Sequence, residues 1–388
     1  MPQIAWARTI RYNLDMRTLQ ATPQTITEPV LDRWSELVNR AVQGEQLSSE
    51  DGLAILRSSD DELLEVLSAA YRVRRQFWGN QVRLNFLVNA KSGACAEDCG
   101  YCSQSRVSQA AIARHGLLPA EQILAGAQTA FQRQAKTYCI VTSGRAPGGR
   151  ELDLVADVVP KIKRQYNLEI CVSAGLLDNE KAQQLKQCGV DRVNHNLNTS
   201  RRFYPQICTT HTYQDRLDTL RAVRNAGMEI CSGGIVGMGE ENADVVELAL
   251  ELGRLGVEAL PVNFFLPIEG TPVTERGKGT QRVPGPHLPE RPGGGHHPQM
   301  VVAQMGTVPF SALTPRYCLK VLALFRLANP RADLRVAAGR EVHLGQLQPL
   351  ALYAANSMFV GDYLTSKGQP PAEDYRMIED LGFQVVEE

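Results

Sequence analysis

Three cysteines lie close together in the segment ACAEDCGYCSQS, which spans residues 94 to 105. Cys95, Cys99 and Cys102 follow the spacing C-x3-C-x2-C. A structural zinc site usually takes four protein ligands in two close pairs, and no second C-x2-C occurs in this chain. Three thiolates suit an iron–sulfur cluster of four irons in which one iron stays open for a small molecule. The alternatives are a zinc site completed by a distant His or Cys, and reactive thiols without a metal.

Three more cysteines occupy comparable places in apolar, strand-like runs. Cys139, Cys171 and Cys231 lie in TYCIVTS, LEICVSA and MEICSGGI, and Arg335 holds the corresponding place in LRVAAGRE. Only every second strand residue points into a barrel, so side chains in phase with one another line one cavity. We interpret Arg335 as a counter-charge to thiolates, because a guanidinium is normally always charged. The alternative is that these cysteines are small buried hydrophobes, which is how we interpret Cys188, Cys208 and Cys318.

Amide side chains recur with a period of two in VNHNLN. Asn194, Asn196 and Asn198 are therefore predicted on one strand face, joined by Asn263 from PVNFF. Amides inside a barrel are costly unless something polar binds them, which favours a ligand such as a ribose, a carboxylate or a urea ring. His195 points the other way by the same parity, and we interpret it as a structural histidine with its hydrogen bonds satisfied.

Glycines gather in CSGGIVGMGE, residues 231 to 240. The segment has neither the P-loop order nor the G-x-G-x-x-G order. It indicates either a close backbone approach to a cofactor or a plain glycine-rich turn.

Short apolar runs alternate with amphipathic segments from residue 81 onward, which is typical of βα units. Eight strands are predicted, at 82–90, 137–143, 168–174, 192–197, 228–235, 260–266, 334–339 and 357–361. Helices are predicted between them, at 119–135, 152–166, 180–189, 213–227 and 315–329. This number and length predict an α/β fold, a (β/α)8 TIM-type barrel over 81–388, with the first cysteine motif in the loop after strand one. A doubly wound open sheet is the alternative.

The N-terminal part and one internal segment depart from this pattern. Helices are predicted at 29–44, 48–58 and 60–79, within an N-terminal helical extension over 28–80 that packs on the barrel. Residues 1–27 are predicted to be a disordered extension, with an organelle transit peptide as the alternative. The Gly- and Pro-rich segment 275–309 is predicted to be a mobile insertion, and its His296 and His297 to be solvated and not metal-bound.

Composition is that of an ordinary enzyme. The chain has 388 residues, 43% hydrophobic and 21% charged, with 41 basic and 42 acidic side chains. No apolar run is long enough for a membrane span, and a formal charge of −1 does not favour nucleic acid as a partner. Nine cysteines are too sparse for a secreted disulfide scaffold, so we expect reduced thiols and a cytoplasmic location.

The cysteine motif, with Tyr101 before its last cysteine, resembles the radical S-adenosylmethionine enzymes. The wider set of stretches resembles the biotin synthase family and covers most of residues 85 to 385 in order: NAKSGACAEDCGYCSQS, YCIVTSGR, RVNHNLNTS, TTHTYQDRLDTL, EICSGGIVGMGE, PVNFFLPIEGTP, AAGREV and LYAANSMFVGDYLT. The segment 275–309 and the long N-terminal segment have no counterpart in that pattern.

The resemblance implies two clusters. Cys95, Cys99 and Cys102 would hold a 4Fe-4S cluster whose open iron binds S-adenosylmethionine, cleaved on reduction to a 5'-deoxyadenosyl radical. The residues implied to contact this cofactor are Tyr101, Asn196, Asn198 and Arg216. Some members carry Asp at the place of Asn198, and an amide holds ribose hydroxyls with less charge assistance.

The second implied cluster is 2Fe-2S, with Cys139, Cys171, Cys231 and Arg335 as ligands. Its sulfide would be inserted into dethiobiotin, which Asn194, Asn196 and Asn263 would contact. A flavodoxin-like electron donor, the iron–sulfur assembly machinery and a second copy of the chain in a homodimer are the implied partners. The alternatives are another radical enzyme of this barrel type, such as a metalloenzyme maturase, and a zinc-stabilised binding module or a thiol redox sensor.

Overall fold

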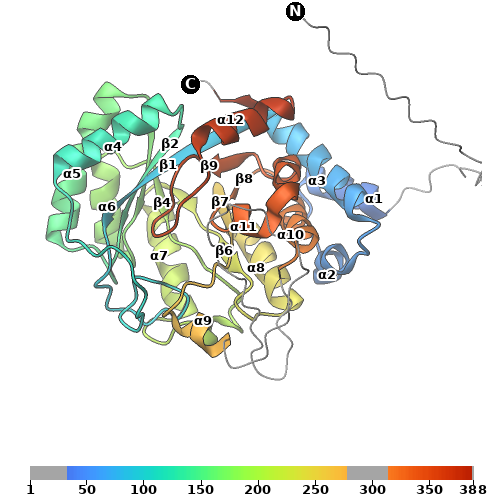
Figure 1. Cartoon of the computed structure of the whole chain (residues 1–388), viewed down its shortest axis with the longest axis horizontal. Coiled ribbons are helices and arrows are strands. Elements are labelled where there is room, and N and C mark those ends of the chain that lie inside the picture. The colour runs from blue at the N-terminus through green and yellow to red at the C-terminus, as the bar shows by residue number, and fades with distance from the viewer. Residues whose placement is uncertain (1–32, 278–312, 387–388) are drawn as a thin grey trace, which may run out of the picture.

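Parallel strands form the wall of a closed barrel in the computed structural model, which describes residues 33–277 and 313–386 (Figure 1). The strands pair in the order of the chain, and β1 also pairs with β9, which closes the barrel. The open-sheet alternative is therefore wrong, and all eight predicted strands are confirmed. Their bounds are β1 Gln81–Lys91, β2 Thr137–Thr142, β3 Glu169–Ser173, β4 Arg192–Asn194, β5 Glu229–Cys231 continued by β6 Gly234–Val236, β7 Ala259–Phe264, β8 Asp333–Val336 and β9 Ser357–Phe359.

Alternation along each strand decides which side chains face the interior. In β2 the hydroxyl of Tyr138 donates to the carbonyl of Ile123 in the surrounding helix layer, at 2.8 Å. Tyr138 therefore points outward, and its neighbour Cys139 points into the barrel. Both faces of such a strand are buried, which explains why the parallel strands read as nearly continuous apolar runs.

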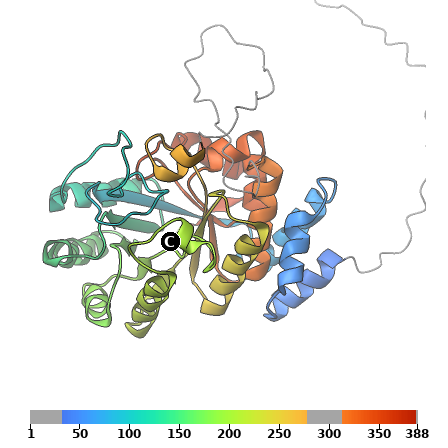
Figure 2. The ribbon, with the colours of Figure 1, turned by 90° about the horizontal axis from the view of Figure 1, so that it is seen from below.

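Helices surround the barrel, as the view along its axis shows (Figure 2). The five helices predicted between strands are confirmed, and the segment between β6 and β7 adds a helix that we did not predict. The bounds are α4 Ala120–Gln132, α5 Gly149–Gln165, α6 Asn179–Gln187, α7 Tyr213–Asn225, α8 Asn242–Leu255, α9 Pro272–Gly277, α10 Pro315–Ala328, α11 Arg340–Leu344 and α12 Pro371–Asp380. The short strand β10, Gln384–Val385, pairs with the start of β1.

The three N-terminal helices pack outside the barrel against α10 and α8 (Figure 1). They are α1 Arg33–Gln43, α2 Ser49–Arg57 and α3 Leu63–Trp78. Ser48 begins α2 with a capping box: its hydroxyl accepts from the Asp51 amide at 3.1 Å, and the Asp51 carboxylate accepts from the Ser48 amide at 2.8 Å.

Two predicted segments fall mostly outside the described residues: the extension over 1–27 and the insertion over 275–309, including His296 and His297. Within residues 33–277 and 313–386, none of the helices combines the length and the apolar character that a membrane crossing needs.

The glycine-rich segment allows its own backbone to lie close to the backbone of β7. A side chain on Gly233 would collide with the Pro261 carbonyl oxygen on β7, at 1.9 Å from the added carbon. The Gly233 amide donates instead to the Asn196 side-chain oxygen at 3.1 Å. Glycine at this point therefore brings β5 and β6 close to β7 and to the amide row.

Candidate active site

The loop after β1 carries the first three cysteines at the carboxyl end of the barrel, where active sites of this fold are built. Cys95, Cys99 and Cys102 line one cavity. The Cys102 amide donates to the Cys99 carbonyl at 3.1 Å, and the Gly93 amide donates to the Gln104 side chain at 2.9 Å. Burial, together with the nearby Cys95, raises the pKa of Cys102. The Cys102 thiol therefore loses its proton most readily when a metal binds it.

Residues 207–211 hold this loop at the barrel mouth, and we call them the clasp. The Asp98 carboxylate accepts from the backbone amides of Thr209 at 2.9 Å and Thr210 at 3.1 Å. The Gly100 amide donates to the Ile207 carbonyl at 2.8 Å. The cysteine loop has no strand partner over these residues, so these bonds fix its position.

Glu97 gives the clasp a buried ionic contact. Its carboxylate accepts from Arg145 Nη1 at 2.9 Å and lies 2.6 Å from His211 Nδ1. The other ring nitrogen of His211 lies 2.9 Å from Arg216 Nη2. An arginine only donates, so Nε2 of His211 accepts and Nδ1 carries the proton that bonds to Glu97.

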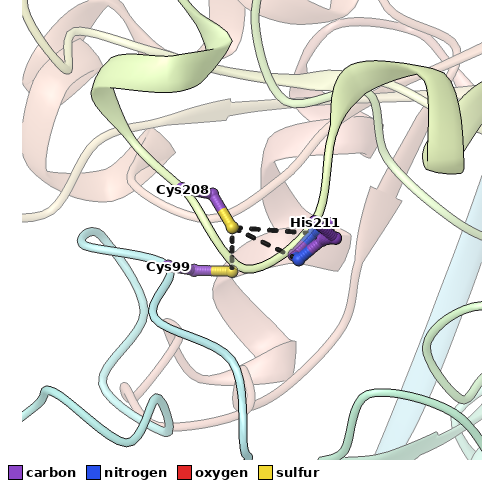
Figure 3. Close-up of side chains that lie close together, drawn as sticks. All are labelled: Cys99, Cys208 and His211. Atoms are coloured by element: carbon purple, nitrogen blue, oxygen red, sulfur yellow. Dashed lines mark hydrogen bonds between the residues drawn. The ribbon is translucent and has the colours of Figure 1, made fainter.

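Cys208 is buried in the hydrophobic core as predicted, but its thiol also lies against Cys99, a contact that we did not predict (Figure 3). Its Sγ is 3.7 Å from Cys99 Sγ, 3.2 Å from His211 Nδ1 and 3.3 Å from Asp98 Oδ1. The hydrogen bond with Cys99 and then the one with His211 lower the pKa of Cys208 to about 5, and the same bond raises the pKa of Cys99. The only sequence signal for this role was the position of Cys208 in CTTH, three residues before a histidine.

Cys99, Cys208 and His211 bring three ligand atoms within 4.8 Å of one another. This is the arrangement that the zinc alternative required, a distant Cys and His beside the motif. Both nitrogens of His211 are already engaged, by Glu97 and Arg216, and the positive Arg216 is next to the ring. The geometry therefore fits a hydrogen-bonded support for Cys99 better than a separate zinc site.

The second cysteine set lies deeper in the barrel and is positioned by strand register. Cys139 pairs with Cys171 across β2 and β3, and Cys231 pairs with Asn194 across β5 and β4. The three thiols are at most 5% exposed and form one cluster with Ala259. This confirms that they face inward in phase. A hydrogen bond with Cys171, supported by Arg335, lowers the pKa of Cys139 and lowers the pKa of Cys231 to about 6.

Arg335 completes this inner set, as predicted. It lines the same cavity as Cys139 and Cys171 and is 1% exposed. Burial disfavours its charge, but Asp333 and the thiols Cys231 and Cys139 outweigh burial and raise the pKa of Arg335. In the cluster-free protein it is a counter-charge to thiolates, which is the role that the residue type predicts.

Three amides lie between the two cysteine sets. Asn194, Asn196 and Asn263 line both the outer cavity with the loop cysteines and the inner cavity with Arg335. The Asn194 amide donates to Cys231 Sγ at 3.2 Å, and the Asn263 amide donates to the Gly234 carbonyl at 3.0 Å. Their remaining donors and acceptors are available to a ligand placed between the sets.

The predicted cofactor-contacting residues gather at the outer cavity. Tyr101, Asn196, Asn198 and Arg216 all line it. Asn198 donates to the Tyr101 hydroxyl at 2.6 Å, and Arg216 donates to the Asn196 carbonyl at 2.7 Å. Asn198 lies beyond β4 with a positive φ of 71°, so strand alternation does not place it there; its isolated bridge to Gly234 does.

His195 departs from our prediction. It was expected to point away from the amides with its hydrogen bonds satisfied, but it lines the outer cavity, and its Nε2 has no partner among the described residues. The reason is that β4 ends at Asn194, so the period of two stops there. Burial, followed by the nearby Arg216 and His211, lowers the pKa of His195 well below its usual value.

Comparisons with known proteins agree with this geometry. Residues 90–252 match the family model described as the Radical SAM superfamily, and residues 298–384 match the Biotin and Thiamin Synthesis associated domain. Among solved structures, methylornithine synthase matches with a TM-score of 0.70 at 19% identity, covering 90% of this chain and 97% of that one. The FeFe-hydrogenase maturase from Carboxydothermus hydrogenoformans matches with a TM-score of 0.69 at 16% identity, covering 91% and 79%. These structures share the fold.

Curated relatives are more specific. The biotin synthase of Rhodopirellula baltica is 49% identical over 353 residues, covering 91% of this chain and 89% of the relative. The biotin synthase of Lysinibacillus sphaericus is 47% identical over 352 residues, covering 91% and 96%. Identity at this level over nearly the full length of both chains exceeds what a shared barrel alone gives, and the chain belongs to the biotin synthase family.

Proposed function

We propose that the two cysteine sets bind two different clusters and that dethiobiotin is held between them. Cys95, Cys99 and Cys102 bind a 4Fe-4S cluster together with S-adenosylmethionine. Cys139, Cys171, Cys231 and Arg335 bind a 2Fe-2S cluster. When bound, the first supplies a 5'-deoxyadenosyl radical that abstracts hydrogen, and the second supplies the sulfur atom that makes biotin from dethiobiotin.

The observation that carries this proposal is the continuous lining of the two cavities. The loop thiols line the outer one, Cys139, Cys171 and Arg335 line the inner one, and Asn194, Asn196 and Asn263 line both. A urea ring and a carboxylate offer the donors and acceptors that these amides need. A substrate placed there has one cysteine set on each side.

The chain's own residues orient the ligands and exclude water. Tyr101, Asn198 and Arg216 line the outer cavity as parts of two hydrogen-bonded pairs, Asn198 with Tyr101 and Arg216 with the Asn196 carbonyl. Leu87, Val141 and Phe359 pack around the inner thiols. A fixed wall on one side and a dry pocket on the other hold a substrate in one orientation.

We also infer the setting of the reaction. All nine cysteines are free in the structure, which suits a cytoplasmic enzyme that receives its clusters from iron–sulfur assembly machinery. A flavodoxin-like protein is the proposed electron donor, and a homodimer is the proposed assembly.

An anaerobic assay tests the proposed reaction. Protein reconstituted with iron and sulfide receives reductant, S-adenosylmethionine and dethiobiotin, and mass spectrometry follows biotin and 5'-deoxyadenosine. We expect both products. Formation of 5'-deoxyadenosine without biotin would contradict dethiobiotin as the substrate, and absence of both from protein with intact clusters would contradict the radical chemistry.

A further inference from the structure

A layer of charged side chains lies one step below the inner cysteines, toward the amino ends of the strands. Three carboxylates each stand two residues before a member of the inner set: Glu169 before Cys171, Glu229 before Cys231, and Asp333 before Arg335. Residues two apart on a strand share a face, so these carboxylates continue the inward-facing columns of the cysteines and of Arg335.

Asp333 differs from the other two in its burial. Its side chain is 1% exposed, whereas those of Glu169 and Glu229 are 29% and 49% exposed. Arg83 Nε and Arg192 Nη1 each lie 3.9 Å from Asp333 Oδ2, and the Asn356 amide donates to Asp333 Oδ1 at 3.2 Å. A carboxylate this deep needs paired charges around it, and Arg335 supplies the nearest of them.

Two anchors hold the Arg335 guanidinium. Nη2 donates to Asp333 Oδ2 at 3.4 Å, and Nε donates to Ser357 Oγ at 3.3 Å. Among the described residues, no hydrogen bond uses Nη1. The planar guanidinium also lies over the Phe359 ring, with its carbon 5.1 Å from the ring centroid. A planar fork held at two nitrogens has its third nitrogen fixed in direction.

On the basis of the two-cluster function proposed above, we propose that Asp333 is a positioning residue for Arg335: it anchors Nη2 so that Nη1 is the nitrogen presented to the 2Fe-2S cluster. Asp333 does not touch the cluster in this account. Its effect reaches the cluster only through the orientation of one guanidinium.

The test is a spectroscopic measurement of the Arg335 nitrogen on the cluster, with Asp333→Asn as the variant. Wild-type and variant proteins are prepared with either 14N or 15N in their arginine guanidinium groups. Each is then reconstituted with iron and sulfide and reduced at cryogenic temperature. Pulsed electron paramagnetic resonance is recorded where the 4Fe-4S signal relaxes too fast to contribute. We expect an isotope-sensitive nitrogen coupling in the wild type that Arg335→Met abolishes and that Asp333→Asn reduces at least two-fold.

Glu229→Gln is the matched control. Glu229 accepts from Arg192 Nε at 2.9 Å and stands two residues before Cys231, just as Asp333 stands two before Arg335. The Glu229→Gln substitution removes one carboxylate from the same layer and leaves the contacts of Arg335 in place. We therefore expect the same nitrogen coupling as in the wild type. An equal loss of the nitrogen coupling in Asp333→Asn and Glu229→Gln would overturn the inference, because it would indicate that removing any carboxylate from this layer weakens the coupling.

The outcomes separate this inference from the proposed function. If the wild type has no coupling that Arg335→Met removes, the ligand role of Arg335 fails, and Asp333 has nothing to position. If that coupling is present and Asp333→Asn leaves it unchanged, the positioning role alone is wrong. Should Asp333→Asn not fold, Asp333→Ser, which leaves room for a water, takes the same test with the same two outcomes.

Discussion

The two cysteine sets are built on opposite principles. Cys95, Cys99 and Cys102 lie on a loop, and Cys95 and Cys102 are partly exposed. Cys139, Cys171 and Cys231 lie at inward-facing positions of β2, β3 and β5 and are all buried. The loop set needs the clasp to hold it in place, whereas hydrogen-bonded ladders hold the strand set.

The difference matches the chemistry that we propose for each set. A loop at the barrel mouth leaves room for a cofactor to enter and leave with every turnover. Strands give a rigid, dry pocket in which an atom can be transferred without water competing. Disturbing the clasp should therefore affect the loop set alone.

The largest expected effect comes from Glu97→Gln. The carboxylate accepts from the half-exposed Arg145 and from the buried His211, so an amide there places its N–H donors against the buried N–H of His211. We expect a loss of about 1–3 kcal/mol in the free energy of unfolding of the cluster-free protein, measured by urea denaturation. In the reconstituted protein, iron should leave the loop set faster while the 2Fe-2S absorption stays unchanged.

Asp157→Asn is the control for that prediction. Asp157 pairs with Lys161 on the surface of α5, and both side chains are nearly half exposed. Asp157→Asn should lower the free energy of unfolding by no more than about 0.5 kcal/mol. If Glu97→Gln destabilises the protein no more than Asp157→Asn does, the clasp does not hold the loop as described.

The next effect concerns His195, which lines the outer cavity beside the loop set. Its pKa is lowered in the folded protein, so the unfolded chain binds the proton more tightly. The stability that neutral His195 allows is complete above about pH 6.5 and is lost as pH falls below it, by at most about 1.4 kcal/mol per pH unit.

Urea denaturation of the cluster-free protein at pH 7.5 and pH 5.5 measures this loss. His195→Gln should show a smaller decrease in stability between the two pH values than the wild type. An equal decrease in both proteins would mean that water reaches His195, so that the outer cavity is more hydrated than the burial of His195 indicates.

The smallest effect is expected from Cys208→Ala. When a metal takes Cys99 as a thiolate, the proton shared by the two sulfurs 3.7 Å apart is best placed on Cys208, which then donates to Cys99. Hydrogen bonds to ligand sulfur raise the potential of an iron–sulfur cluster. Removing the donor should lower the 4Fe-4S potential and slow 5'-deoxyadenosine formation roughly two- to ten-fold with a weak reductant, the equivalent of one hydrogen bond.

Cys208→Ser keeps a donor and should stay close to the wild type in both measurements. Redox titration followed by electron paramagnetic resonance gives the potential directly. A potential unchanged in Cys208→Ala would rule out this contact as an influence on the loop set.

The strands and the inner cysteines were predictable because strand periodicity is local. Runs such as TYCIVT show both the strand and its apolar character, and three cysteines in phase indicated a shared cavity. The loop motif was equally visible as a spacing. Both the strand pattern and the cysteine spacing are local in the sequence, so neither depends on how the barrel closes.

One contact that we missed is long-range. Cys208 meets Cys99 only because the chain returns to the barrel mouth more than 100 residues later, at a separation of 109 positions. His195 was misplaced because β4 is only three residues long, so its end could not be read from an apolar pattern. Asp333 went unnoticed because a single acid before a strand arginine looks like a surface residue in sequence.

The central claim is that the two cysteine sets have separate roles, and one paired measurement tests it most directly. Cys99→Ala and Cys139→Ala are reconstituted and assayed for 5'-deoxyadenosine and biotin under the same anaerobic conditions. We expect Cys99→Ala to form neither product, and Cys139→Ala to form 5'-deoxyadenosine but no biotin. Biotin from Cys139→Ala, or loss of 5'-deoxyadenosine in that variant while its 4Fe-4S cluster is intact, would contradict the account.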